Sequence, residues 1–139
     1  MKKSLLLIIS LFLLMGCNND KVDELVCSKN NNDDTKEEII ATFNNDVLEN
    51  IEISVSKKIP DDSLATVYSV NLLEDTESMY ENTDSVSVNT KVEDDIVTLI
   101  TSINYKTFST NDESVIDIKK DITFNELKKH YEDLEYICK

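Results

Sequence analysis

Glycine is almost absent from this 139-residue chain, in which the one glycine is Gly16. The rest of the chain therefore has no P-loop, no dinucleotide-binding fingerprint and no Gly-x-Ser-x-Gly elbow, since each needs glycine for positive φ or close backbone approach. Tryptophan is missing. Arginine is missing too, and its absence excludes bidentate guanidinium recognition of carboxylates and phosphates. One histidine, His130, is the sole imidazole. These absences predict a protein that is not an enzyme, without catalytic residues, cofactor or metal site.

Acidic residues outnumber basic ones, 28 to 14, for a net charge of −14. Such a surface repels phosphate backbones over a Debye length of about 8 Å, so we predict no nucleic-acid partner. The acidic doublets are candidates for weak calcium binding. None has the alternating ligands and closing glutamate of an EF-hand loop, so solvated turns are the favoured interpretation.

The first residues have the layout of an export signal. Two lysines precede an apolar run from Leu5 to Met15, which is too short to span a bilayer comfortably. The run ends in Leu-Met-Gly-Cys17, which resembles a bacterial lipobox, although Met15 is bulkier than the usual residue there. The alternative is an ordinary secretory signal in which Cys17 is incidental. The layout predicts a lipoprotein signal peptide over 1–16, a short lipidated tether over 17–22 and an extracytoplasmic domain over 23–139.

Two or three acyl chains, palmitate among them, would anchor Cys17 firmly, whereas one chain binds only marginally. The predicted location is the cell membrane, on its extracytoplasmic face, where disulfides persist. Without residues 1–16 the chain carries 12 lysines against 28 acidic residues, a net charge of −16. We expect a monomer whose partners are the membrane, through the lipid on Cys17, and an envelope protein or peptide.

Asparagine and aspartate clusters supply the turns that glycine does not. Between them, alternating apolar residues predict strands, and spacings near 3.6 predict helices. The expected strands cover 25–27, 37–43, 49–59, 85–92, 97–105 and the closing 135–139, and the expected helices cover 63–80 and the segment from 123 to 134. Residues 106–122 are undecided between a strand, a helix and a loop.

The two helices have different signatures. The first has an apolar stripe of Leu64, Tyr68, Leu72 and Met79 with support from Val67, and Asp62 or Ser63 offers its N-cap. The second opens on the capping-box pattern Thr123 to Glu126 and carries a core-facing stripe of Leu127, Tyr131 and Leu134. Short turns imply antiparallel pairing. The predicted class is α+β: a single domain with an antiparallel β-sheet built from hairpins and two α-helices packed on it.

With Cys17 assigned to the lipid, Cys27 and Cys138 remain as an even pair. A disulfide between them would close a loop of about 110 residues and contribute about 4–5 kcal/mol by the chain-entropy model. A metal-binding pair is one alternative, but it lacks two ligands beyond His130. A redox-active pair is the other, but the chain has no C-x-x-C.

The closing segment, L-x-x-x-Y-x-x-L-x-Y-x-C-K over 127–139, and the opening Val26-Cys27-Ser28-Lys29 resemble those of small Firmicutes-type lipoproteins of the YehR-like family. The resemblance covers most of the chain after the lipobox. It implies an α+β lipoprotein domain with a terminal disulfide. The family's domain has no settled function, so no catalytic residue is carried over.

Three functions are consistent with these patterns. The first is a non-enzymatic domain that binds a partner or contributes to the envelope, which would show an exposed apolar patch or a tyrosine-lined cleft. The second is a small carboxylate-dependent hydrolase of cell-wall glycans, which needs two carboxylates about 5–9 Å apart across a cleft. The third is a purely structural lipoprotein. His130 is expected at a solvated rim, and the tyrosines are expected mainly in the core.

Overall fold

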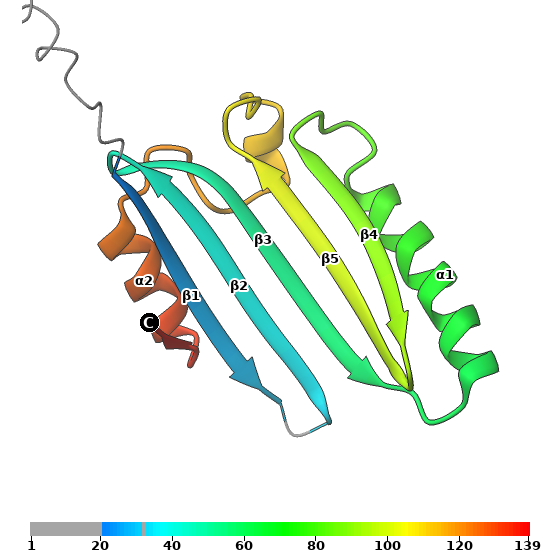
Figure 1. The fold of residues 1–139 in the computed structure, drawn as a ribbon. Helices are drawn as coiled ribbons and strands as arrows, with labels where there is room; N and C mark the ends of the chain where they lie inside the picture. Colours follow the sequence, from blue (N-terminus) through cyan, green and yellow to red (C-terminus); the bar gives the residue numbers. More distant parts are fainter. Residues whose placement is uncertain (1–20, 32) are drawn as a thin grey trace, which may run out of the picture.

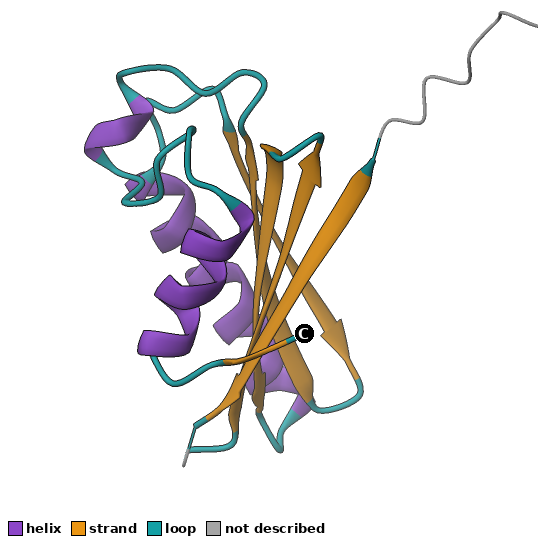
Figure 2. Cartoon of the chain, turned by 90° about the vertical axis from the view of Figure 1, so that its left-hand side faces the viewer, coloured by secondary structure: helices purple, strands orange, loops and turns teal. Residues whose placement is uncertain are grey.

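Six strands form one antiparallel sheet in the computed structural model, which describes residues 21–31 and 33–139. The strand order is β4-β5-β3-β2-β1-β6, and both helices lie on the same face of the sheet (Figures 1 and 2). This confirms the predicted single α+β domain. Cys17 and the predicted signal peptide lie outside the described residues. The elements are β1 (Val22–Asn30), β2 (Thr35–Asn44), β3 (Val47–Lys58), α1 (Asp62–Met79), β4 (Val86–Glu93), β5 (Ile96–Asn104), the 3-10 helix η2 (Asp112–Ser114), α2 (Phe124–Asp133) and β6 (Ile137–Cys138).

Asparagine and aspartate provide the tight turns, as the sequence predicts. Positive φ angles occur at Asp34, Asn45, Asp46 and Asp94, each in the turn of a hairpin. In the β2–β3 turn both central residues are left-handed, with φ of 50° and 64°, which matches the twist of the strands they join. The fifth residue with a positive φ, Glu135 at 69°, is neither asparagine nor aspartate, and it lies just after the end of α2. Among the described residues, short polar side chains therefore replace glycine at four of the five left-handed positions.

The main core lies between α2, the loop after β5 and the strands β1, β2, β3 and β5. The capping box at Thr123 is confirmed, and Leu127 and Tyr131 of α2 are buried as predicted. Leu134, the third member of that predicted stripe, is instead 48% exposed, because α2 ends at Asp133 and the chain turns there. The ring of Phe43 from β2 meets Phe124 edge-on, at 5.4 Å between centroids.

Residues 106–122 form an irregular loop that contains the single-turn helix η2. The Tyr105 hydroxyl donates to the Ile118 carbonyl at 3.0 Å, and burial raises the pKa of this tyrosine. Within the loop, the buried Asp112 Oδ2 accepts from the backbone N–H of Ser109 at 2.7 Å and from its hydroxyl at 3.0 Å. The loop is therefore tied to the core by specific polar contacts, which its apolar pattern does not reveal.

Replacing Asp112 by asparagine is expected to lower the midpoint of thermal unfolding at neutral pH. The Ser109 hydrogen bonds hold the pKa of Asp112 below its ordinary value, so the native state favours the carboxylate. A lowered native pKa contributes stability above the unfolded-state pKa and loses it as pH falls through the native value. The difference between wild type and Asp112→Asn should therefore shrink on acidification below about pH 4. Exposed Glu113→Gln is the control, and a pH-independent difference would contradict this role for the carboxylate.

Helix α1 packs on β4 and β5 through an unexpected face. The N-cap of α1 is Asp61, whereas the sequence predicted Asp62 or Ser63. The Asp61 Oδ1 accepts from the backbone N–H groups of Ser63 and Leu64 at 2.9 and 3.1 Å. The buried residues of α1 are small: Ala65, Ser69 and Thr76. The predicted position of the helix is right, whereas its predicted stripe is wrong as a core face. Of that stripe only Leu72 is half-buried; the others, Leu64, Val67, Tyr68 and Met79, are exposed.

Candidate functional site

Large apolar side chains are concentrated on the solvent side of α1. Leu64 is 61% exposed, Val67 58% and Tyr68 37%. These three positions are related by i, i+3 and i+4 spacing, so they are neighbours on one side of the first two turns. We call them the outer face of α1. Val70 and Met79 are exposed on the flanks of the same helix.

The same side of α1 becomes acidic further along. Glu74 and Asp75 follow Val67 and Tyr68 by seven residues each, two helical turns, and both are exposed. Asn71, also exposed, lies between the apolar and acidic parts. The outer face is therefore an apolar patch that leads into a pair of carboxylates.

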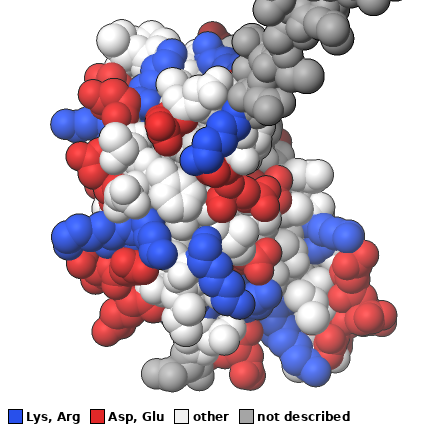
Figure 3. Space-filling view, turned by 60° about the vertical axis from the view of Figure 1, so that its left-hand side comes forward, with Lys and Arg blue, Asp and Glu red and all other residues white. Residues whose placement is uncertain are grey.

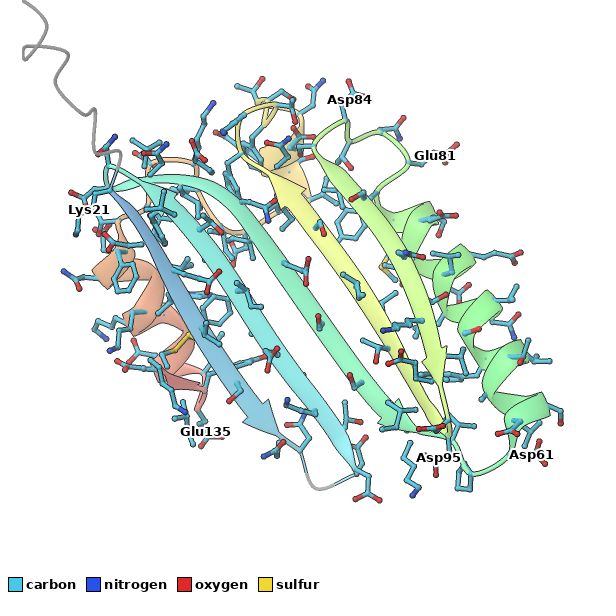
Figure 4. All side chains as sticks on the ribbon, in the orientation of Figure 1. Lys21, Asp61, Glu81, Asp84, Asp95 and Glu135 are labelled. Atoms are coloured by element: carbon cyan, nitrogen blue, oxygen red, sulfur yellow. A yellow bond between two sulfur atoms is a disulfide. The ribbon has the colours of Figure 1, made fainter. Side chains whose placement is uncertain are left out.

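Within residues 21–31 and 33–139, no ion pair involves an acidic residue of α1 or of the segments that flank it. Between Lys58 and Lys91 the chain has no lysine, and it has seven carboxylates there: Asp61, Asp62, Glu74, Asp75, Glu77, Glu81 and Asp84. Figure 4 shows Asp61 where α1 begins and Glu81 and Asp84 beyond its other end. The acidic residues thus lie at and beyond the two ends of α1, whereas residues 63–73 between them carry no charge.

Helix α2 is different, because its charges occur in pairs. Lys128 and Lys129 face Glu132 and Asp133 across i, i+4 spacings, with N–O distances of 3.8 and 2.5 Å. Figure 3, which brings the α2 and β1 edge of the sheet forward, shows lysine and acidic side chains side by side. Exposed ion pairs of this kind contribute little to stability. They do place positive and negative charge side by side on the surface of α2. Unbalanced negative charge next to exposed apolar residues therefore distinguishes α1 from α2.

The two predicted cysteines lie together at the opposite edge of the sheet. Cys27 and Cys138 form a disulfide, as predicted, and face each other in the β1–β6 pairing. The Tyr136 hydroxyl donates to a Glu37 carboxylate oxygen, and burial together with this bond raises the pKa of Tyr136. Lys29 Nζ donates to the Leu134 carbonyl at 2.9 Å and lies 5.5 Å from the centroid of the Tyr136 ring. These contacts fasten the end of the chain and form no open site.

The other candidates from the sequence do not converge on one site. His130 is half-buried, edge-on to Tyr131 at 5.2 Å between centroids. Tyr105 and Tyr131 are core residues, as expected, and burial raises the pKa of Tyr131 to about 12. Within residues 21–31 and 33–139 there is no cluster of three or more metal-ligating side chains, and no helix long and apolar enough to cross a bilayer.

Two of the surface hollows are lined by both acidic and basic residues. The first, of about 530 Å³, lies on the loop after β5 and is lined by Glu113, Ile116, Asp117, Lys119, Lys120 and Asp121. A second, of about 440 Å³, lies over the helix-free face of the sheet, where Ser56 and Thr98 form a hydrogen bond of 2.9 Å.

The hydrolase alternative needs a carboxylic acid that stays protonated, and the general acid of a glycoside hydrolase therefore has a raised pKa. Among the described carboxyl groups the displaced pKa values are lowered, at Asp33, Asp61, Asp95, Asp112 and Glu126.

Sequence reasoning missed the outer face of α1, although a signal for it is present. Ala65, Ser69 and Thr76 also recur at helical spacing, and they compete with the larger apolar stripe for the core-facing side. The larger stripe is the natural choice, because burying Leu, Met and Tyr removes more apolar surface from water. The structure places the smaller residues against the sheet.

No protein-family model matches the chain, and no curated protein matches its sequence. Two solved structures share its fold. The NMR structure of E. coli YehR has a TM-score of 0.66 and 14% identity, over 86% of this chain and 92% of that one. The NMR structure of a protein from Streptococcus pneumoniae TIGR4 has a TM-score of 0.59 and 15% identity, over 91% of this chain and 90% of that one. The chain therefore has the YehR-like fold that the closing segment predicts.

Proposed function

We propose that this protein is a membrane-anchored, extracytoplasmic lipoprotein of the Firmicutes-type, YehR-like kind that binds an envelope protein and has no enzymatic activity. The outer face of α1 is the binding surface. The observation that carries this proposal is the inverted burial of α1. Its small residues face the sheet, while Leu64, Val67 and Tyr68 face solvent.

The inversion has a physical cost in the free protein. Each Å² of apolar surface left in water forgoes about 25 cal/mol that burial would provide. A contiguous group of exposed large apolar side chains therefore marks an interaction surface more often than a single exposed residue does. Polar residues at these positions would make an ordinary solvated helix, so the patch is best explained by a partner that covers it.

The lipid on Cys17 would orient this surface. Cys17 is five residues before Val22, where β1 begins, so the connection spans at most about 18 Å. The end of the sheet that carries Lys21 would consequently face the membrane. Figure 4 places Lys21 at one end of the sheet and Asp61 at the other, and the outer face begins three residues after Asp61. The apolar patch would then point into the envelope, away from the lipid.

Replacing Cys17 by serine is expected to release the protein from the membrane, because the acyl chains would provide the anchor. The measurement is the share of protein in the membrane fraction after high-salt washing, together with the intact mass of the exported chain. Asn18→Ser, which changes the residue directly after the cysteine and leaves Cys17 in place, is the control and should remain membrane-bound. Equal membrane retention of Cys17→Ser and wild type would count against lipidation.

Replacing Leu64 and Val67 by glutamine is expected to reduce the recovery of a specific partner at least tenfold after crosslinking in intact cells. Glutamine preserves helix propensity while it removes apolar surface. The matched control is Val92→Thr with Ile96→Thr, which also removes two exposed apolar side chains, 39% and 44% exposed, from β4 and β5. Both variants should unfold at midpoints near that of wild type. Equal recovery from the Leu64/Val67 variant, or no partner from wild type, would refute the proposal.

A further inference from the structure

We infer that the partner presents a cationic amphipathic segment to the outer face of α1. The inference rests on the proposed function and adds the chemistry of the partner. The apolar patch alone would accept any apolar surface. The charges around it restrict the choice.

Charge complementarity identifies the sign of the partner. The outer face runs from Leu64, Val67 and Tyr68 into Glu74 and Asp75, and no lysine occurs from residue 59 to residue 90. A partner that covers the patch brings its neighbouring side chains within a few Å of these carboxylates. Acidic side chains there would be repelled, whereas Lys or Arg would be attracted and would steer the encounter.

A second copy of this chain is the wrong occupant for the same reason. Pairing α1 with α1 would place Glu74 and Asp75 of one copy near the acidic residues of the other. The whole chain is also strongly acidic, with a net charge of −14. Like charges across an interface disfavour association, so the outer face is better suited to a different protein.

The geometry favours a helical or extended segment laid along α1. Its apolar side chains would contact Leu64, Val67 and Tyr68, and its basic side chains would lie about two turns further along, near Glu74 and Asp75. Eighteen residues of α1 span about 27 Å, which is long enough for three to four turns of a partner helix. Recognition of an amphipathic segment by apolar anchors and a charged rim is a common mode of peptide binding.

The test uses the full chain in intact cells, with a photoreactive amino acid at position 71. Asn71 is exposed and lies between the patch and the two carboxylates, so it reports on occupancy of the outer face. The site variant is Glu74→Gln with Asp75→Asn. The matched control is Glu24→Gln with Glu52→Gln, which changes the net charge equally on the helix-free face of the sheet. Mass spectrometry identifies the crosslinked peptide of the partner.

The expected result is one adduct whose crosslinked segment carries Lys or Arg beside apolar residues. Its yield should fall about three- to tenfold in the Glu74/Asp75 variant and stay unchanged in the Glu24/Glu52 control. An adduct with an acidic or neutral segment, or a yield that the site variant does not change, would overturn the cationic partner and leave the proposed function standing. An adduct with a second copy would overturn the inference as well. No adduct at all would refute the proposed function itself.

Discussion

Replacing both Cys27 and Cys138 by serine is expected to lower the free energy of unfolding by about 4–5 kcal/mol. The disulfide joins residues 111 apart, and closing so long a loop removes much of the entropy of the unfolded chain. Domains of this size have about 5–15 kcal/mol of stability in total. The double variant should therefore have a much lower urea midpoint, with the slope altered because its unfolded state is more expanded.

Hydrogen bonds at the end of the chain would reduce this loss of stability but would not prevent it. Lys139 N–H donates to the Val26 carbonyl at 2.9 Å, and Lys29 and Tyr136 keep their bonds in the absence of the disulfide. Wild type in a reducing agent should match the double serine variant. A loss below about 1 kcal/mol would mean that these contacts, and not the covalent link, hold the chain end in place.

Replacing Leu127 by alanine is expected to cost about 2–5 kcal/mol, whereas Leu64→Ala should change stability by less than about 1 kcal/mol. Both substitutions remove the same atoms from a helix. Leu127 is fully buried in the core beneath α2, and Leu64 is 61% exposed on α1. Only the first substitution leaves a cavity.

The pair is informative because the apolar pattern assigns both leucines to the core. Urea denaturation of the two variants, with wild type alongside, measures the difference directly. Comparable losses at the two positions would mean that α1 packs through Leu64 after all, and the inverted burial would be wrong. Leu73→Ala is an intermediate control, because Leu73 is half-buried on the same helix.

The fold was predictable where one face of an element has to be buried. Alternation located the strands, and the pairing of Cys27 with Cys138 followed from counting cysteines. Strand ends were less predictable. β1 begins at Val22 and extends to Asn30, since pairing with β2 continues beyond the apolar residues that mark its centre.

The orientation of α1 could not be predicted, because its sequence offers two stripes and tertiary packing chooses between them. The apolar stripe led by Leu64 would remove more surface from water, but the observed helix lies on β4 and β5 through Ala65, Ser69 and Thr76. A pattern of apolar residues cannot separate a core face from a face that a partner covers, because both are apolar. The apolar pattern that correctly located the core residues of other elements therefore assigned the candidate site on α1 to the core as well.

The conformation of the loop after β5 could not be predicted from the sequence for another reason. Its buried residues Ile116 and Ile118 have the apolar character of a strand, yet the hydrogen bonds of Asp112 and Tyr105 fix an irregular path. Such contacts join residues whose proximity depends on the whole fold. Local patterns do not contain them.

The most direct measurement of the central claim is the maleimide labelling rate of a Val67→Cys variant, compared between purified protein and intact cells at native expression. Intact mass should first verify that Cys27 and Cys138 remain paired. We expect rapid labelling of the purified protein and at least tenfold slower labelling in cells, because a partner covers the outer face of α1. Ile96→Cys, on the exposed start of β5, should react at the same rate in both settings. Equal rates for Val67→Cys in the two settings would contradict the claim that a partner occupies this face, and slow labelling in both would contradict its exposure.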